Sequence, residues 1–158
     1  RLNGLSLRLP GGEPTLRRLE RAGAWWPADA RSMVAAALLA TGHSPNATDR
    51  AALIQGERWL ESARPRVDVA PSGAIALEWL SVDSPAYNAP VEGQIVSEWD
   101  WVILTHAPTP HLAEDFIRRQ TSTWRQPSPG ALALADVPPT TSFEMCRIFE
   151  RVAVGRPT

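Results

Sequence analysis

The sequence predicts an α+β fold, in which N-terminal helices precede a small antiparallel sheet with one inserted helix, and the sheet packs as a single layer on helices. Two observations predict this class. The 15 prolines divide the 158 residues into proline-free windows, where regular structure can form. Before Pro65 the apolar residues recur with a helical period, and after it they alternate as in strands.

One domain is expected, because 158 residues is a typical single-domain length. We divide the domain 1–158 into an N-terminal arm (1–14), a helical part (15–63) and a sheet-plus-helix part (67–154). Within the arm, residues 2–9 alternate between apolar and polar types around an Asn-Gly pair. This pattern predicts a strand at the edge of the sheet.

The helical part should contain three helices. A short Arg-rich helix is expected over 15–22, closed by Gly23. A second helix is expected over 28–41, and a third over 48–63 with its N-cap at Thr48-Asp49. The last two should form a helical hairpin. The side of the third helix that we expect to be buried carries Ala52, Gly56, Trp59, Leu60 and Ala63.

Strands are expected over 67–69, 74–79 and 95–104, where the apolar residues alternate. If the last two pair with each other, Trp79 lies opposite Trp99, and the indole rings anchor the sheet to the helices. The tryptophans would then occupy the face opposite to the acidic residues of the same strands.

A further helix should begin at Thr109-Pro110, with the threonine as N-cap and the proline in the first turn. Its predicted buried stripe is Leu112, Phe116, Ile117 and Trp124. Residues 131–137 are expected to form a short strand. Residues 143–154 fit either a strand or a helix, and we expect a closing strand there.

The charge pattern indicates protein partners. All 16 basic residues are arginine, because the chain has no lysine, and the net charge is −1. Residues 1–66 carry a net charge of +4 and residues 67–158 a net charge of −5. Such a dipolar layout favours association between copies, so we expect a homo-oligomer or a part of a larger assembly. The near-neutral total argues against a nucleic-acid partner.

No membrane span is expected, since the longest uncharged apolar run, 33–40, is too short to cross a bilayer. The single cysteine, Cys146, has apolar neighbours and is predicted to be a buried, inert thiol. One cysteine excludes an internal disulfide and fits a cytoplasmic or virion location. The chain begins with Arg1, so the sequence leaves open whether a targeting segment precedes it.

Two sets of charged residues are the candidate interaction sites. The basic set comes from the expected helix over 15–22, and the acidic set would share one face of the sheet if Trp79 pairs with Trp99. These candidates are Arg17, Arg18 and Arg21 in the basic set, and Glu78, Glu98 and Asp100 in the acidic set.

Enzyme chemistry has weaker support. His106 and His111, with Glu114 or Asp115, could form an acid-base or metal cluster, but they fit better as residues of a strand-to-helix turn. Phosphate-binding glycine patterns, nucleophile elbows and zinc-ligand spacings are absent from the sequence. We therefore lean against an enzyme, and expect no catalytic, cofactor-binding or metal-binding residues.

The expected order of elements over 48–154 is similar to that of small phage tail-completion or tail-terminator proteins. This resemblance implies a non-enzymatic assembly subunit of a phage or phage-derived particle, which forms rings at the end of a tail tube. One alternative is a small binding module, such as an immunity protein or inhibitor whose acidic sheet face covers a basic partner. The other alternative is an enzyme that uses His106 and His111.

Overall fold

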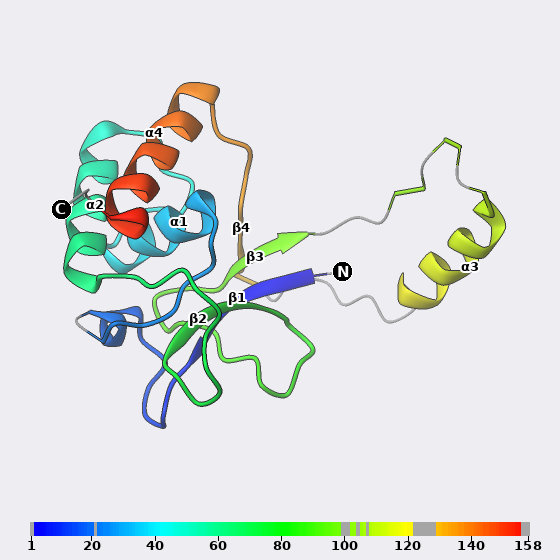
Figure 1. The fold of residues 1–158 in the computed structure, drawn as a ribbon, viewed down its shortest axis with the longest axis horizontal. Coiled ribbons are helices and arrows are strands. Elements are labelled where there is room, and N and C mark those ends of the chain that lie inside the picture. Colours follow the sequence, from blue (N-terminus) through cyan, green and yellow to red (C-terminus); the bar gives the residue numbers. More distant parts are fainter. Residues whose placement is uncertain are drawn as a thin grey trace.

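The computed structural model describes residues 2–20, 22–98, 102–103, 105–106, 108–121 and 129–155. These residues form four α-helices and a four-stranded mixed sheet, which confirms the predicted α+β class. The helices are α1 (Ala30–Ala40), α2 (Arg50–Ala63), α3 (Pro110–Thr121) and α4 (Pro139–Phe149). The strands are β1 (Leu2–Arg8), β2 (Ala76–Ser81), β3 (Ile95–Glu98) and β4 (Leu132–Ala133). Figure 1 shows α1, α2 and α4 together on one side of the sheet, while α3 stands apart from them.

The sheet has the order β2-β1-β3-β4. The N-terminal strand β1 therefore lies inside the sheet, and the expectation of an edge strand is wrong. Because β1 pairs antiparallel with both β2 and β3, it also separates the two strands that we expected to pair. β4 runs parallel to β3, so β2, β3 and β4 all point in the same direction and β1 opposes them.

One face of the sheet packs against the helices. Leu5 lies opposite Trp79 and Leu7 opposite Leu77 in the β1–β2 register, so these four side chains share a face. Leu5, Leu7 and Leu77 are fully buried in the core that includes α1, whose residues 32–40 are all buried. As predicted, Trp79 lies on the face opposite to Glu78.

The predicted helical hairpin is confirmed. The Asp29 side chain caps α1 by accepting a hydrogen bond from the Ser32 amide, and Asp49 caps α2 through the Ala52 amide. At the end of α2, Arg64 adopts a left-handed conformation with φ of 52°. The buried stripe of α2 contains all the predicted residues together with Leu53.

The predicted first helix is shorter than expected. It is a 3-10 turn over Leu16–Leu19, which begins with Thr15 as its cap. Gly23 has the positive φ that a closing residue needs, at 56°. The expected strand over 67–69 is absent, and the Val69 side chain is 94% exposed.

The C-terminal segment is a helix, so the expectation of a closing strand over 143–154 is wrong. α4 runs from Pro139 and continues as one π-helical turn over Glu150–Val154. Met145 and Ile148, three positions apart, are both buried and pack this helix on α1. Cys146 points away from that stripe and is exposed, so the prediction of a buried thiol is also wrong.

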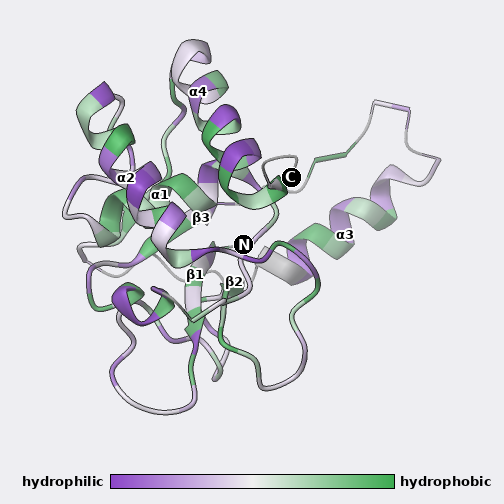
Figure 2. Ribbon diagram, turned by 60° about the vertical axis from the view of Figure 1, so that its left-hand side comes forward, coloured by the Kyte–Doolittle hydropathy of each residue, from purple (hydrophilic) through white to green (hydrophobic). Residues whose placement is uncertain are grey.

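α3 begins at Pro110 as predicted, but two residues of its expected buried stripe are exposed and a third, Ile117, is only half-buried. Leu112 is 57% exposed and Phe116 is 48% exposed, while Trp124 lies outside the described residues. Figure 2 shows α3 with both hydrophobic and hydrophilic turns, standing away from the helices over the sheet. The helix therefore adds little to the core.

Two expected strands are shorter than predicted. The strand expected over 95–104 is observed as β3, which ends at Glu98. Residues 102 and 103 are not in a strand, and residues 99–101 and 104 lie outside the described part of the chain. β4 covers two residues of the expected 131–137. No helix in the described part of the chain has both the length and the apolar character that a bilayer span requires.

Candidate ligand-binding pocket

Of the basic residues predicted as an interaction site, the structure describes Arg17 and Arg18. Arg17 is exposed, but the Arg18 guanidinium donates hydrogen bonds to the carbonyl oxygens of Gly11 and Glu13. It therefore holds the loop after β1 against the 3-10 turn. Arg21 lies outside the described residues.

The two described residues of the acidic set, Glu78 and Glu98, lie far apart. Glu78 and Glu98 share a sheet face, because they pair with Ser6 and Leu2 of β1, which point the same way. Since β1 lies between them, strand spacing and rise place them about 16 Å apart. Glu78 forms an ion pair with Arg8 at 3.6 Å. Asp100 lies outside the described residues.

The face that carries Glu78 and Glu98 is also covered in its centre. Ser6 on this face is 1% exposed, and its hydroxyl accepts a hydrogen bond of 2.9 Å from the Asn88 amide in the loop between β2 and β3. The Tyr87 ring of the same loop lies over Gly4, where an added Cβ would collide with it. An open acidic sheet face, as the binding-module alternative requires, is therefore not present around Ser6.

The two histidines of the enzyme alternative lie on the surface. His106 and His111 are both exposed, as are Glu114 and Asp115. Within the described ranges, no three His, Cys, Asp or Glu side chains are grouped so that they could hold a metal ion.

A pocket that the sequence did not predict lies between the sheet and the N-terminus of α1. Its volume is about 640 Å³, in the range of small-molecule sites. Four segments far apart in sequence form it: the start of α1, β2, β3, and the chain from β4 into α4. The lining residues are Asp29, Arg31, Ser32, Trp79, Ser97, Leu134, Ala135, Asp136, Val137 and Ser142.

Strand direction explains why these residues meet. β2, β3 and β4 run the same way, so their carboxyl ends lie at one edge of the sheet. Trp79 and Ser97 lie in the second halves of β2 and β3, opposite Leu5 and Asn3 of β1, and therefore on the face toward α1. Ligands of sheets covered by helices commonly bind at this edge, outside the carboxyl ends of parallel strands.

A chain of hydrogen bonds orders the inner wall of the pocket. The Trp79 indole Nε1 donates to the Ser32 hydroxyl at 2.8 Å. The Ser32 amide donates to Asp29 Oδ1, also at 2.8 Å. Ser32 is 3% exposed, so this hydroxyl is held inside the protein. The indole ring and the Asp29 carboxylate are thereby fixed relative to the first turn of α1.

The outer wall, residues 134–137, is held by Asn46 in the loop between α1 and α2. Asn46 Nδ2 donates to the Ala133 carbonyl oxygen at 2.8 Å, and Oδ1 accepts from the Ala135 amide at 3.0 Å. This pair of bonds imitates the pairing of a neighbouring strand. Arg31 connects the same groups, because its guanidinium donates to Asn46 Oδ1 and to the Ala135 carbonyl oxygen.

The charge that the pocket offers to a ligand is negative. Arg31 is occupied by these oxygen atoms and by the Pro45 carbonyl at 2.8 Å. Burial lowers the pKa of the Arg31 guanidinium from its ordinary value, and the Asp29 carboxylate acts against that shift. Asp29 and Asp136 are both exposed to solvent, and Asp136 has no hydrogen-bond or ion-pair partner in the described part of the chain.

The pocket contains none of the predicted site residues. Its members are scattered from Asp29 to Ser142, and each has an ordinary structural explanation in its own segment. Asp29 is a helix cap and Trp79 is a core-facing strand residue, so no local pattern distinguishes them as a site. Only the order of the strands brings them together.

No protein-family model and no curated protein sequence matches this chain. Among solved structures, the chain is similar to a spermidine/putrescine ABC transporter substrate-binding protein from Streptococcus pneumoniae. The identity is 15%, the TM-score is 0.49, and the match covers 60% of this chain and 38% of the other.

Proposed function

We propose that this chain is a non-enzymatic binding unit whose pocket at the carboxyl ends of β2, β3 and β4 takes a small molecule with a protonated amine. The observation that supports this best is the convergence of an indole and two solvent-accessible carboxylates, those of Asp29 and Asp136, on one cavity. The only cation among its lining residues, Arg31, is bound to oxygen atoms of the protein.

Each lining group suits such a ligand. An ammonium group has only donors, so carboxylates and serine hydroxyls are its natural partners. The face of an indole attracts a cation through its π-electrons, and Trp79 is partly exposed in the pocket wall. An anionic ligand would have to approach Asp29 and Asp136 without a free cation in the lining to offset them.

Three small molecules of similar size test the charge preference: butylammonium, butanol and butyrate. Calorimetric titration of the purified chain should give a measurable affinity for butylammonium and none for butyrate. Asp136→Asn should weaken butylammonium binding by about three- to tenfold, as expected for the loss of one charge-assisted contact near solvent. Asp68→Asn is the matched control, because Asp68 is exposed and lies outside the pocket.

Equal affinity for all three molecules, or equal losses in Asp136→Asn and Asp68→Asn, would contradict the proposal. Binding of butyrate alone would show that the pocket prefers anions and would also count against it.

We also propose a second role, in protein assembly, through α3. The supporting observation is the exposure of Leu112 and Phe116, which are four residues apart and so share a helix side. Acidic Glu114 and Asp115 precede two arginines along this helix. In an antiparallel pair of α3 helices from two copies, opposite charges would therefore lie side by side, which favours a homodimer.

Sedimentation equilibrium tests the assembly role. The native chain should form dimers that Phe116→Glu dissociates, whereas Phe143→Glu, a change at a 66% exposed residue of α4, should leave them intact. A monomeric native chain would contradict the assembly role.

The narrower proposal of a phage tail-completion or virion subunit, with its cytoplasmic or virion location, still depends on the order of elements in the sequence alone. The closing strand expected in that order is a helix here.

A further inference from the structure

The ligand pocket beside Trp79 offers more hydrogen-bond acceptors than one ammonium group can use, since the donors of such a group are its N–H bonds alone. Asp29 Oδ1 accepts from the Ser32 amide, but Oδ2 accepts no hydrogen bond from the residues that the structure describes. Asp136 adds both of its carboxylate oxygens, which have no donor in the same part of the chain. A ligand that uses these acceptors fully would carry further donors.

Two serine hydroxyls extend this set of polar groups, and they come from different segments. Ser97 lies in β3 and Ser142 near the start of α4, and both line the pocket. Ser97 is partly exposed and Ser142 is exposed, so both are accessible to a ligand. A hydroxyl both donates and accepts, which makes it a natural partner for another hydroxyl. These two side chains therefore suit hydroxyl groups on the ligand.

Trp79 supplies the pocket with carbon surface and with no further donor. Its indole Nε1 donates to the Ser32 hydroxyl at 2.8 Å, so this N–H is used inside the protein. Trp79 itself is partly exposed in the pocket lining. Leu134 and Val137, also partly exposed, add apolar surface from the chain between β4 and α4. The pocket thus combines apolar walls with hydroxyls and carboxylates.

The polar groups reach the pocket from separate elements: the start of α1, β3, and the chain from β4 into α4. A linear amine such as butylammonium has a single polar end, so it leaves part of this set to water. A ring with polar substituents around its rim and C–H groups on its faces presents both kinds of surface at once. The volume of about 640 Å³ lies in the range of pockets that enclose molecules of that size.

We propose that the ligand of this pocket is an amino sugar, a ring that carries an ammonium group and several hydroxyls. This inference rests on the proposed function, because it keeps the ammonium group beside Asp29 and Asp136. It adds two contacts: ring hydroxyls bond to Ser97 and Ser142, and the C–H face of the sugar packs on the indole of Trp79.

Three ring molecules separate the amine from the hydroxyls. Glucosamine carries both, cyclohexylammonium carries only the amine, and glucose carries only the hydroxyls. Calorimetric titration, at a pH at which both amines are protonated, should give glucosamine an affinity about tenfold higher than that of cyclohexylammonium, as expected for two further hydrogen bonds. Glucose should bind more weakly than glucosamine. Ser97→Ala and Ser142→Ala should each weaken glucosamine binding by about two- to tenfold and leave cyclohexylammonium binding unchanged.

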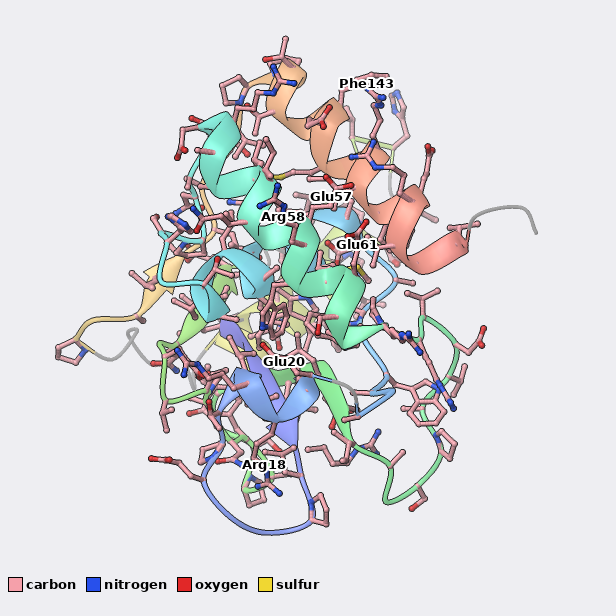
Figure 3. The ribbon with its side chains drawn as sticks, turned by 90° about the vertical axis from the view of Figure 1, so that its left-hand side faces the viewer. Arg18, Glu20, Glu57, Arg58, Glu61 and Phe143 are labelled. Atoms are coloured by element: carbon pink, nitrogen blue, oxygen red, sulfur yellow. The ribbon has the colours of Figure 1, made fainter. Side chains whose placement is uncertain are left out.

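Ser62→Ala is the matched control, because Ser62 is an exposed serine of α2 outside the pocket lining. Figure 3 shows α2 toward the viewer, with Glu61, the neighbour of Ser62 in the sequence, labelled on it. This replacement should change the affinity for neither amine. Circular dichroism of each variant establishes that it is folded.

The outcomes distinguish this inference from the proposed function. If cyclohexylammonium binds as tightly as glucosamine, the amino-sugar inference fails while the amine proposal stands. If neither amine binds, both fail. Glucose that binds as tightly as glucosamine would show that the ammonium group contributes nothing, which also overturns both. Equal losses of glucosamine affinity in Ser97→Ala, Ser142→Ala and Ser62→Ala would overturn the assignment of the hydroxyl contacts and the inference with it.

Discussion

Replacing Asn46 with alanine should release the outer wall of the ligand pocket. The substitution removes the hydrogen bonds that the Asn46 side chain makes to Ala133 and Ala135, at 2.8 and 3.0 Å, and the one that it accepts from Arg31. A hydrogen bond contributes about 0.5 to 1.5 kcal/mol net, and bonds near solvent lie at the low end. We therefore expect the free energy of unfolding to fall by about 2 kcal/mol.

Urea unfolding followed by circular dichroism measures this loss, and hydrogen exchange at the Ala135 amide locates it. The matched variant is Asn46→Asp, which retains the acceptor for Ala135 and Arg31 but loses the donor to Ala133. Its loss should be smaller, about 1 kcal/mol, since a carboxylate strengthens the contact with Arg31. If Asn46→Ala changes the unfolding free energy by less than about 0.5 kcal/mol, the wall is held by other contacts and the reasoning fails.

Gly4→Ala should destabilise the fold by about 1 to 3 kcal/mol, because the new Cβ would lie 2.7 Å from Cε2 of Tyr87. Gly56→Ala should be neutral or stabilising by up to about 1 kcal/mol, since its nearest contact is 3.6 Å away and alanine favours a helix; thermal unfolding in which Gly56→Ala is the more harmful change would contradict both. Burial raises the pKa of Tyr87, the only tyrosine in the chain. Burial of the neutral Tyr87 side chain contributes its full share of the unfolding free energy below the ordinary tyrosine pKa of about 10, and this share should be lost as the pH rises through the higher pKa of the folded protein. An absorbance titration in which Tyr87 has the same pKa in the folded and the urea-unfolded chain would contradict this prediction. Cys146 is exposed and should react with a thiol reagent in the native protein, whereas protection until unfolding would contradict its exposure on α4.

Helices were predictable where their ends are marked by side chains. Asp49 and the break at Arg64-Pro65 define α2, and its buried stripe follows from helical spacing alone. The segment 143–154 was not predictable in this way, because Met145 and Ile148 fit a helix while neighbouring apolar residues also fit a strand. The structure selects the helix because both side chains pack against α1.

The sheet order was beyond the reach of local patterns. The alternation in residues 2–9 indicated a strand, but only tertiary packing inserts β1 between β2 and β3. That insertion separates Glu78 from Glu98, two of the three residues of the predicted acidic set. It also leaves three strands that run the same way, whose shared edge forms the pocket. The formation of the pocket and the separation of Glu78 from Glu98 therefore have the same cause.

The central claim is that the pocket beside Trp79 binds a protonated amine, and the indole Nε1–H signal of Trp79 tests it most directly. Titration with butylammonium, followed by two-dimensional NMR with this signal assigned through Trp79→Phe, should shift the Trp79 signal in a saturable way. The indole signals of Trp26 and Trp59, which lie outside the pocket lining, should stay in place. An unchanged Trp79 signal at saturating ligand, or equal shifts of all three indoles, would contradict the account.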